Sequence, residues 1–278
     1  MIQSMLKYQF LQNAVLAGVL ASVACGLIGV IIVEKKLVMM SGGIAHTSYG
    51  GVGLGYLLGF EPIVGAMIFS LGAAIGIGYI KRRGGTRSDV VISLFWSLGM
   101  ALGILFIALM PGYPPDISSY LFGSILSVTK ADLYLMIGAT LIVTVAVITF
   151  FNDWKAYLFD EEFASILGIK TAFFEYFLMV LIAMTVVVLI RVVGIILVLA
   201  LLTAPAAVAG MFTSDLIKRM LYSVLLGNVF CFAGLWISYR MNIASGAAIV
   251  VLSASSYVIT YLAREKYKKA KAASLAGH

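Results

Sequence analysis

The sequence predicts an all-α fold, a polytopic integral membrane helical bundle with about eight or nine transmembrane helices and one further short helix on the cytoplasmic side. Of its 278 residues, 62% are hydrophobic and 11% are charged, whereas soluble domains are about half apolar and a quarter charged. Several apolar runs also reach the roughly 20 residues that a helix needs to cross a bilayer. The net charge of +7 therefore reflects membrane orientation, and no nucleic-acid partner is expected.

The apolar runs place nine candidate spans along the chain. They cover residues 10–33, 37–59, 62–80, 89–110, 133–151, 172–190, 192–212, 221–239 and 243–262. A re-entrant second span would lower the count to eight. Composition indicates no soluble domain, so residues 1–278 are expected to form a single integral membrane domain.

Basic residues predict the orientation, because cytoplasmic loops carry an excess of lysine and arginine. Lys81 to Arg87, Lys218 with Arg219, and the tail 264–278 are the basic clusters. They predict a multi-pass protein of the inner or plasma membrane with a cytoplasmic C-terminus and, for nine spans, an external N-terminus. Arg191 interrupts a long apolar stretch and is interpreted as an external turn between two spans.

Few other polar groups fall near the predicted spans. Segment 117–132 is interpreted as a short amphipathic helix at the outer face. Glu61 and Asp116 lie at the outer rim, as cation-attracting groups or as ordinary solvated carboxylates. Asn228 is expected to form a hydrogen bond between helices.

Cys25 and Cys231 lie within apolar runs, where burial as small hydrophobic residues, metal ligation and a disulfide all remain open.

The second span is rich in glycine and contains His46. Gly51, Gly55 and Gly59 recur every four residues, a spacing typical of closely packed membrane helices. A broken helix that lines a substrate path is the alternative. His46 fits either a structural hydrogen bond or a contact with a substrate, since ionisable groups at membrane depth often mark pathways and imidazole is a common metal ligand.

The loop 152–171 predicts a capped amphipathic helix over about 158–168. Asp160 suits the N-cap, with Glu161 and Glu162 in the first turn, where their charge complements the helix dipole. Phe163, Ile166 and Leu167 form an apolar face by their i, i+3, i+4 spacing. Gly168 fits the C-terminal stop. Surface helices on membranes usually carry lysine and arginine, so docking into a groove of a protein partner is the preferred interpretation over a helix on the bilayer.

Taken together, five segments resemble the membrane permease subunit of ABC-type divalent-metal importers, the zinc/manganese/iron permease family. In chain order they are "LQNAVLAGVLASVACGLIGVIIVEKKLVMMSGGIAHTSYGGVGLGYLLG", "YLFGSILSVTKADL", "LFDEEFASILGI", "RVVGIILVLALLTAPAAVA" and "GLWISYRMNIASGAAIVVLSASSYVI". The resemblance implies a homodimeric permease with two cytoplasmic ATPase subunits and an extracytoplasmic metal-binding protein. It also implies that the helix at 158–168 is the coupling helix, formed here by Asp160, Glu161, Glu162, Phe163, Ala164, Leu167 and Gly168.

The resemblance implies no enzymatic activity in this chain and no permanently bound cofactor. The sequence has no G-x-x-x-x-G-K-[ST] phosphate loop, so ATP hydrolysis is expected on a separate subunit. Two rival hypotheses are an ABC-type permease for a metal chelate such as a siderophore or cobalamin, and an intramembrane enzyme. The second has no support from a catalytic motif such as H-E-x-x-H.

The family pattern glycine–aspartate–x–x–x–histidine corresponds here to "SGGIAH", so His46 is kept and Gly42 stands in place of the aspartate. The expected transport path then consists of His46 and Gly42 with hydroxyls such as Ser41 and Thr47. Two imidazoles in a dimer suit zinc better than manganese, which prefers oxygen ligands. Zinc is therefore the favoured divalent metal, with manganese or iron as the alternatives.

Overall fold

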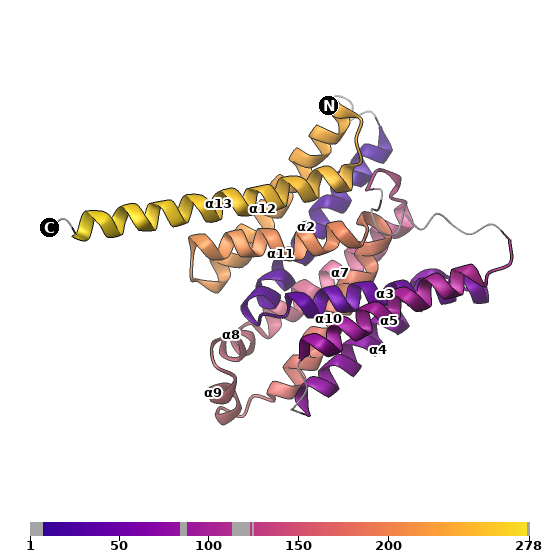
Figure 1. Cartoon of the computed structure of the whole chain (residues 1–278), viewed down its shortest axis with the longest axis horizontal. Coiled ribbons are helices and arrows are strands. Elements are labelled where there is room, and N and C mark those ends of the chain that lie inside the picture. Colours follow the sequence, from indigo (N-terminus) through magenta and orange to yellow (C-terminus); the bar gives the residue numbers. More distant parts are fainter. Residues whose placement is uncertain (1–7, 84–87, 113–122, 124, 277–278) are drawn as a thin grey trace.

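The structure is a computed structural model that describes residues 8–83, 88–112, 123 and 125–276. Within these residues every regular element is a helix (Figure 1). The predicted all-α membrane bundle is confirmed. The helices are α2 (Gln9–Glu34), α3 (Val38–Leu58), α4 (Pro62–Arg82), α5 (Ser88–Ala108), the 3₁₀ turn η1 (Ile125–Ser127), α7 (Lys130–Thr149), α8 (Phe151–Phe159), α9 (Glu161–Ile166), α10 (Thr171–Val193), α11 (Ile195–Phe212), α12 (Leu216–Met241) and α13 (Ser245–Ala276).

Each of the nine predicted spans coincides with one long helix, with ends that differ by a few residues except in α13, which continues well past residue 262. In the described residues, eight helices are long and apolar enough to cross a membrane. The glycine-rich α3 is not among the eight, although its 21 residues match the length of the neighbouring α4. The chain is thus a multi-pass membrane protein.

Two connections differ from the sequence-based expectation. The loop after residue 151 begins with a further helix, α8, which the sequence analysis did not foresee. Of the expected outer helix 117–132, residues 117–122 and 124 lie outside the described residues, whereas 125–127 form only a 3₁₀ turn. The last residues of the expected helix belong to α7 instead. The Thr129 hydroxyl accepts a hydrogen bond from Asp132 N, and the Asp132 carboxylate accepts one from Thr129 N. This capping box starts α7 at Lys130.

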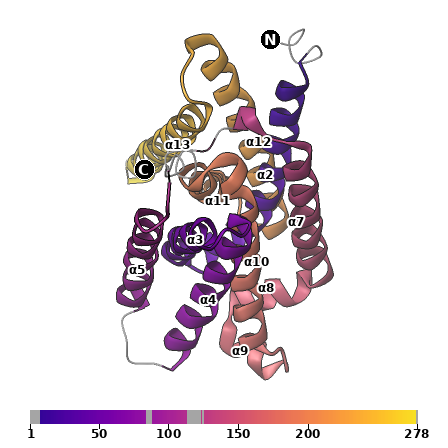
Figure 2. The ribbon, with the colours of Figure 1, turned by 90° about the vertical axis from the view of Figure 1, so that its right-hand side faces the viewer.

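Helix α3 lies between α4, α5, α10 and α11 (Figure 2). A Cβ at Gly51 would clash with the Gly65 carbonyl of α4, and one at Gly53 would lie 2.6 Å from Gly103 O of α5. Backbones that touch in this way require residues without side chains. The expected glycine packing is confirmed for Gly51 on this evidence, and the helix is unbroken from Val38 to Leu58.

The predicted stripe is wrong in one member. Gly59 has open space around it and a φ of 75°, so it ends α3 in the left-handed region instead of packing against a neighbour. The alternative of a broken second span is also wrong, since α3 keeps its helical backbone through Gly42 and Gly43.

At the end of the bundle opposite α9, Arg191 ties three helices together. Its guanidinium lies 2.6 Å from Glu61 at the start of α4 and 2.9 Å from Asp132 at the start of α7. Arg191 occupies the last turn of α10, just before the turn into α11, as predicted. Glu61 therefore forms an ion pair within the chain, with Arg191. Asp116 lies outside the described residues.

Two further predictions concern polar and sulfur-containing side chains within the spans. Cys25 and Cys231 are buried and free, and Ser22 Oγ lies 3.5 Å from Cys231 Sγ. The prediction for Asn228 is wrong. Its Nδ2 donates to Val224 O one turn back in the same helix, at 2.8 Å, because a helical backbone always offers a carbonyl at that distance.

We expect Gly51→Ala to lower the melting temperature of the purified protein in detergent by several degrees. The added methyl would press on the Gly65 carbonyl, and overpacking of this kind costs about 1–3 kcal/mol. Gly72→Ala in α4 is the matched control, because a Cβ there meets nothing within 4 Å. An unchanged melting temperature for Gly51→Ala would contradict the close α3–α4 packing.

Candidate functional site

His46 lies in the middle of α3 and stacks on Trp96 of α5. The two ring centroids are 4.1 Å apart with an interplanar angle of 10°. Its Nδ1 atom is enclosed, with no hydrogen-bond partner in the described part of the chain. The alternative of a satisfied structural hydrogen bond thus finds no support at Nδ1. Sequence reasoning missed Trp96, whose apolar span gave no signal of this contact.

Gly42 lies one turn before His46 on the same face of α3. A Cβ at Gly42 would meet only Trp96 Cζ3, at 3.5 Å, which is an ordinary contact. A Cβ at Gly43 would instead lie 2.7 Å from Ile92 Cγ2. Gly43 is therefore a packing glycine, whereas Gly42 leaves space for at least a Cβ atom on the face of α3 that carries His46.

The structure does not direct the predicted hydroxyls toward an open site. Thr47 Oγ1 donates to two backbone carbonyls, Gly43 O of α3 at 2.7 Å and Phe95 O of α5 at 3.0 Å. Ser41 Oγ donates to Val38 O at 2.8 Å and is fully buried. Both hydroxyls hold the backbone in place, and their part in a transport path stays a prediction. No group of three His, Cys, Asp or Glu side chains that could hold a metal occurs in the described residues.

Helix α9 is capped as predicted. Asp160 Oδ1 accepts from Glu162 N at 2.9 Å and from Phe163 N at 3.0 Å. The residue after the final turn, Gly168, has a φ of 81°, which suits glycine. The helix is shorter than the predicted 158–168, because the extended backbone of Asp160 separates it from α8.

The outer side of α9 is apolar and exposed. Ile166 is 82% exposed and Phe159, just before the helix, is 91% exposed; Phe163 and Leu167 are also exposed, while Ala164 is buried. Figure 1 shows α8 and α9 together at one end of the bundle. Large apolar side chains grouped in this way mark a surface for binding a protein or a membrane.

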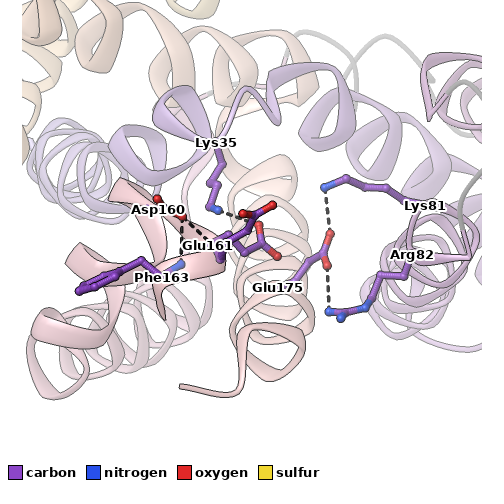
Figure 3. Close-up of polar contacts among 8 residues, drawn as sticks. Lys35, Lys81, Arg82, Asp160, Glu161, Phe163 and Glu175 are labelled. Atoms are coloured by element: carbon purple, nitrogen blue, oxygen red, sulfur yellow. Dashed lines mark hydrogen bonds and ion pairs between the residues drawn. The ribbon is translucent and has the colours of Figure 1, made fainter. Parts of the chain in front are cut away.

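Ion pairs join helices beneath α9 (Figure 3). Glu175 of α10 lies 2.9 Å from Lys81 Nζ and 3.2 Å from Arg82 Nη1 at the end of α4. Lys35 Nζ, after α2, lies 3.1 Å from Glu161 Oε2 in α9. Arg219 of α12 pairs with Glu34. Sequence reasoning missed these pairs, although a carboxylate in the first turns of the apolar α10 was an available signal.

The comparisons with known proteins cover almost the whole chain. The family model described as "ABC 3 transport family" matches residues 7–264. The uncharacterized membrane protein slr2045 of Synechocystis sp. is 42% identical over 94% of this chain and 92% of its own length. The manganese transport system membrane protein MntC of Listeria monocytogenes is 33% identical over 94% and 93%. Among solved structures, PsaBC from Streptococcus pneumoniae in complex with Fab aligns with a TM-score of 0.86 and 33% identity, covering 97% of this chain and 98% of the other.

We expect Asp160→Ala to loosen α9, because loss of an N-cap costs about 1 kcal/mol. Hydrogen exchange at the amides of Glu162 and Phe163 should become faster, since both amides lose their acceptor. Asp160→Asn keeps an accepting oxygen and should exchange almost as slowly as the wild type. Equal exchange in all three proteins would show that the cap does not stabilise the helix.

Proposed function

The chain belongs to the ABC 3 transport family, and on this premise we propose that it is the membrane-spanning subunit of an ATP-driven importer for a divalent transition metal, with Mn²⁺ as the first candidate. The observation that carries the proposal is the similarity over the full length to chains named as manganese transport proteins, such as MntC. In this proposal the metal is cargo, and the chain makes and breaks no covalent bonds.

ATP would be hydrolysed on a separate subunit that binds α9. The capped helix presents exposed Phe163, Ile166 and Leu167, which fit a groove in a protein partner. Lys81, Arg82 and Arg219 lie at the same end of the bundle as α9. By the positive-inside rule this end faces the cytoplasm, which would also place the end of α13 and the C-terminus there.

The metal would pass beside His46. Its imidazole lies next to the space at Gly42, and its Nδ1 has no protein partner in the described residues. A second copy of the chain would supply a second imidazole, and an extracytoplasmic binding protein would deliver the ion at the opposite end. A site with few ligands binds weakly, which suits an ion that has to leave again.

The residues of this chain support a second candidate metal, zinc. Manganese prefers oxygen ligands, whereas imidazole suits zinc and other late first-row metals. The described part of α3 offers His46 but no carboxylate, because Gly42 stands where the family pattern has aspartate. The name of the Listeria relative favours manganese, and this local chemistry favours zinc, so uptake assays should compare the two ions directly.

Metal uptake into proteoliposomes tests the proposal. The chain, co-reconstituted with its ATPase and binding protein, should import Mn²⁺ only when ATP is supplied. His46→Ala should lower uptake about tenfold or more, since loss of even an outer-shell partner at a metal site costs that much. Ser97→Ala, on an exposed face of α5, should keep wild-type uptake. Import that continues without ATP would contradict the function, and full uptake by His46→Ala would remove this residue from the path.

A separate expectation concerns Gly42→Asp, which places a carboxylate one helical turn from the imidazole. The Cβ of the new side chain meets only Trp96, at an ordinary contact distance of 3.5 Å. We expect the ratio of Mn²⁺ to Zn²⁺ uptake to rise several-fold, since the added oxygen donor suits the harder ion. Gly42→Asn has the same shape without the charge and should change the ratio less. If both variants keep the wild-type ratio, Gly42 does not lie beside the moving metal.

A further inference from the structure

Lys35, the C-cap residue of α2, links the small helix α9 to the junction between α2 and α3, the helix that carries His46. Its Nζ lies 3.1 Å from Glu161 Oε2, across 126 residues of sequence. In Figure 3 the Lys35 side chain reaches from the α2–α3 junction toward the first turn of α9. The chain itself connects α9 with α8 and α10. The ion pair is therefore a connection between α9 and the α2–α3 junction that the backbone does not provide.

The position of the Lys35 amine is defined by two groups. Besides Glu161, the ring of Tyr157 in α8 lies 3.5 Å from Nζ. Tyr157 is buried and stacks near Phe174. Burial, with the neighbouring carboxylates of Glu161 and Glu175, raises the pKa of the Tyr157 phenol, so the ring stays neutral and attracts the cation. The Lys35 side chain is only 15% exposed, which limits its freedom to move independently of α8 and α9.

The junction after Lys35 leaves little slack before α3. Lys36 adopts a φ of 56°, and Leu37 N donates back to Ile32 O at 2.9 Å. Leu37 is buried and forms the N-cap position of α3. From there the helix runs without a break to His46, a distance of roughly 12 Å at the usual rise per residue. A displacement of Lys35 would therefore act directly on the first turn of α3.

A second ionic contact at this end has a different character. The Glu175 side chain is 6% exposed and is paired with both Lys81 and Arg82, so breaking it would leave a charge buried without a partner. The Glu161 side chain is 48% exposed, and water can replace Lys35 there. The Glu175 contact thus fixes α10 to α4, whereas the Lys35–Glu161 contact joins α9 to the α2–α3 junction, and its carboxylate can be neutralised without leaving Glu161 buried and unpaired.

We propose that Lys35 is a positioning residue that carries displacement of α9 to the N-terminal end of α3. This inference rests on the proposed function, because it takes an ATPase bound to α9 as the source of the movement. In Figure 3 Lys35 approaches α9 from a different side than Phe163, which belongs to the exposed apolar group with Ile166 and Leu167. Its effect on the metal would be exerted through α3 and His46.

The test measures Mn²⁺ imported per ATP hydrolysed in proteoliposomes that contain the whole transporter. Lys35→Met keeps the alkyl stem over Tyr157 and removes the charge, and Glu161→Gln keeps the shape of the carboxylate. Each variant should lower the ratio about fivefold, the effect expected for one partly exposed ion pair, while the ATPase remains bound and active. The two changes combined should be no worse than either alone, since they remove the same contact.

Two further proteins separate the link from other roles of these residues. Lys35→Arg keeps a cation beside Glu161 and over the Tyr157 ring and should keep most of the ratio, which a general disturbance of the junction would not allow. Lys36→Met is the matched control, because Lys36 is the adjacent exposed lysine, and it should keep the wild-type ratio. A wild-type ratio in Lys35→Met, or losses that add in the double variant, would overturn the inference.

A second measurement does not depend on the cargo. Hydrogen exchange at the amides of Val38 to Gly42 is followed in the assembled complex with and without a non-hydrolysable ATP analogue. The wild type should show an ATP-dependent change, and Lys35→Met should lose it. Retention of the change in Lys35→Met would reject the link. If the wild type imports no Mn²⁺ but shows the ATP-dependent change in hydrogen exchange, Mn²⁺ is refuted as the cargo. The link through Lys35 is still supported in that case.

Discussion

The close approach of α3 to α4 and α5 is the constraint on which the rest of the structure depends. Where Gly51 meets Gly65 and Gly53 meets Gly103, the helices touch through their backbones. In lipid, such packing contributes much of the attraction between helices, since there is no water to exclude. It holds α3 laterally inside the bundle, so that His46 and the space at Gly42 lie against Trp96 of α5.

Charged side chains gather at the two ends of this packed centre. At one end Arg191 connects the starts of α4 and α7 with the end of α10. At the α9 end, Glu175 and Lys35 connect the segments around α9 with α4 and with the α2–α3 junction. Charges are costly within the bilayer, so ionic contacts between helices form where the helices end. Those ends are also where a partner protein can act on the bundle.

Much of the fold could be predicted because its signals are local. An apolar run of membrane length identifies a helix whatever its neighbours are, and the Asp160 cap with Gly168 identifies α9 from a few residues. The errors arose where a residue or segment could serve more than one role. Asn228 bonds to its own helix, Gly59 ends α3, and α8 forms in a stretch of nine residues that is too short and too polar to be taken for a span.

The sequence by itself determined that the chain is a bundle of about eight or nine long helices, that α9 is capped, and that His46 is the candidate metal contact, because hydropathy, caps and residue chemistry act within one or two helical turns. Only the tertiary structure decided which glycines pack, that Trp96 lies on His46, and that Lys35 reaches Glu161 across 126 residues. These contacts join segments that are distant in the chain. Which residues meet in these contacts depends on how the helices cross. The composition of a single helix does not specify that crossing.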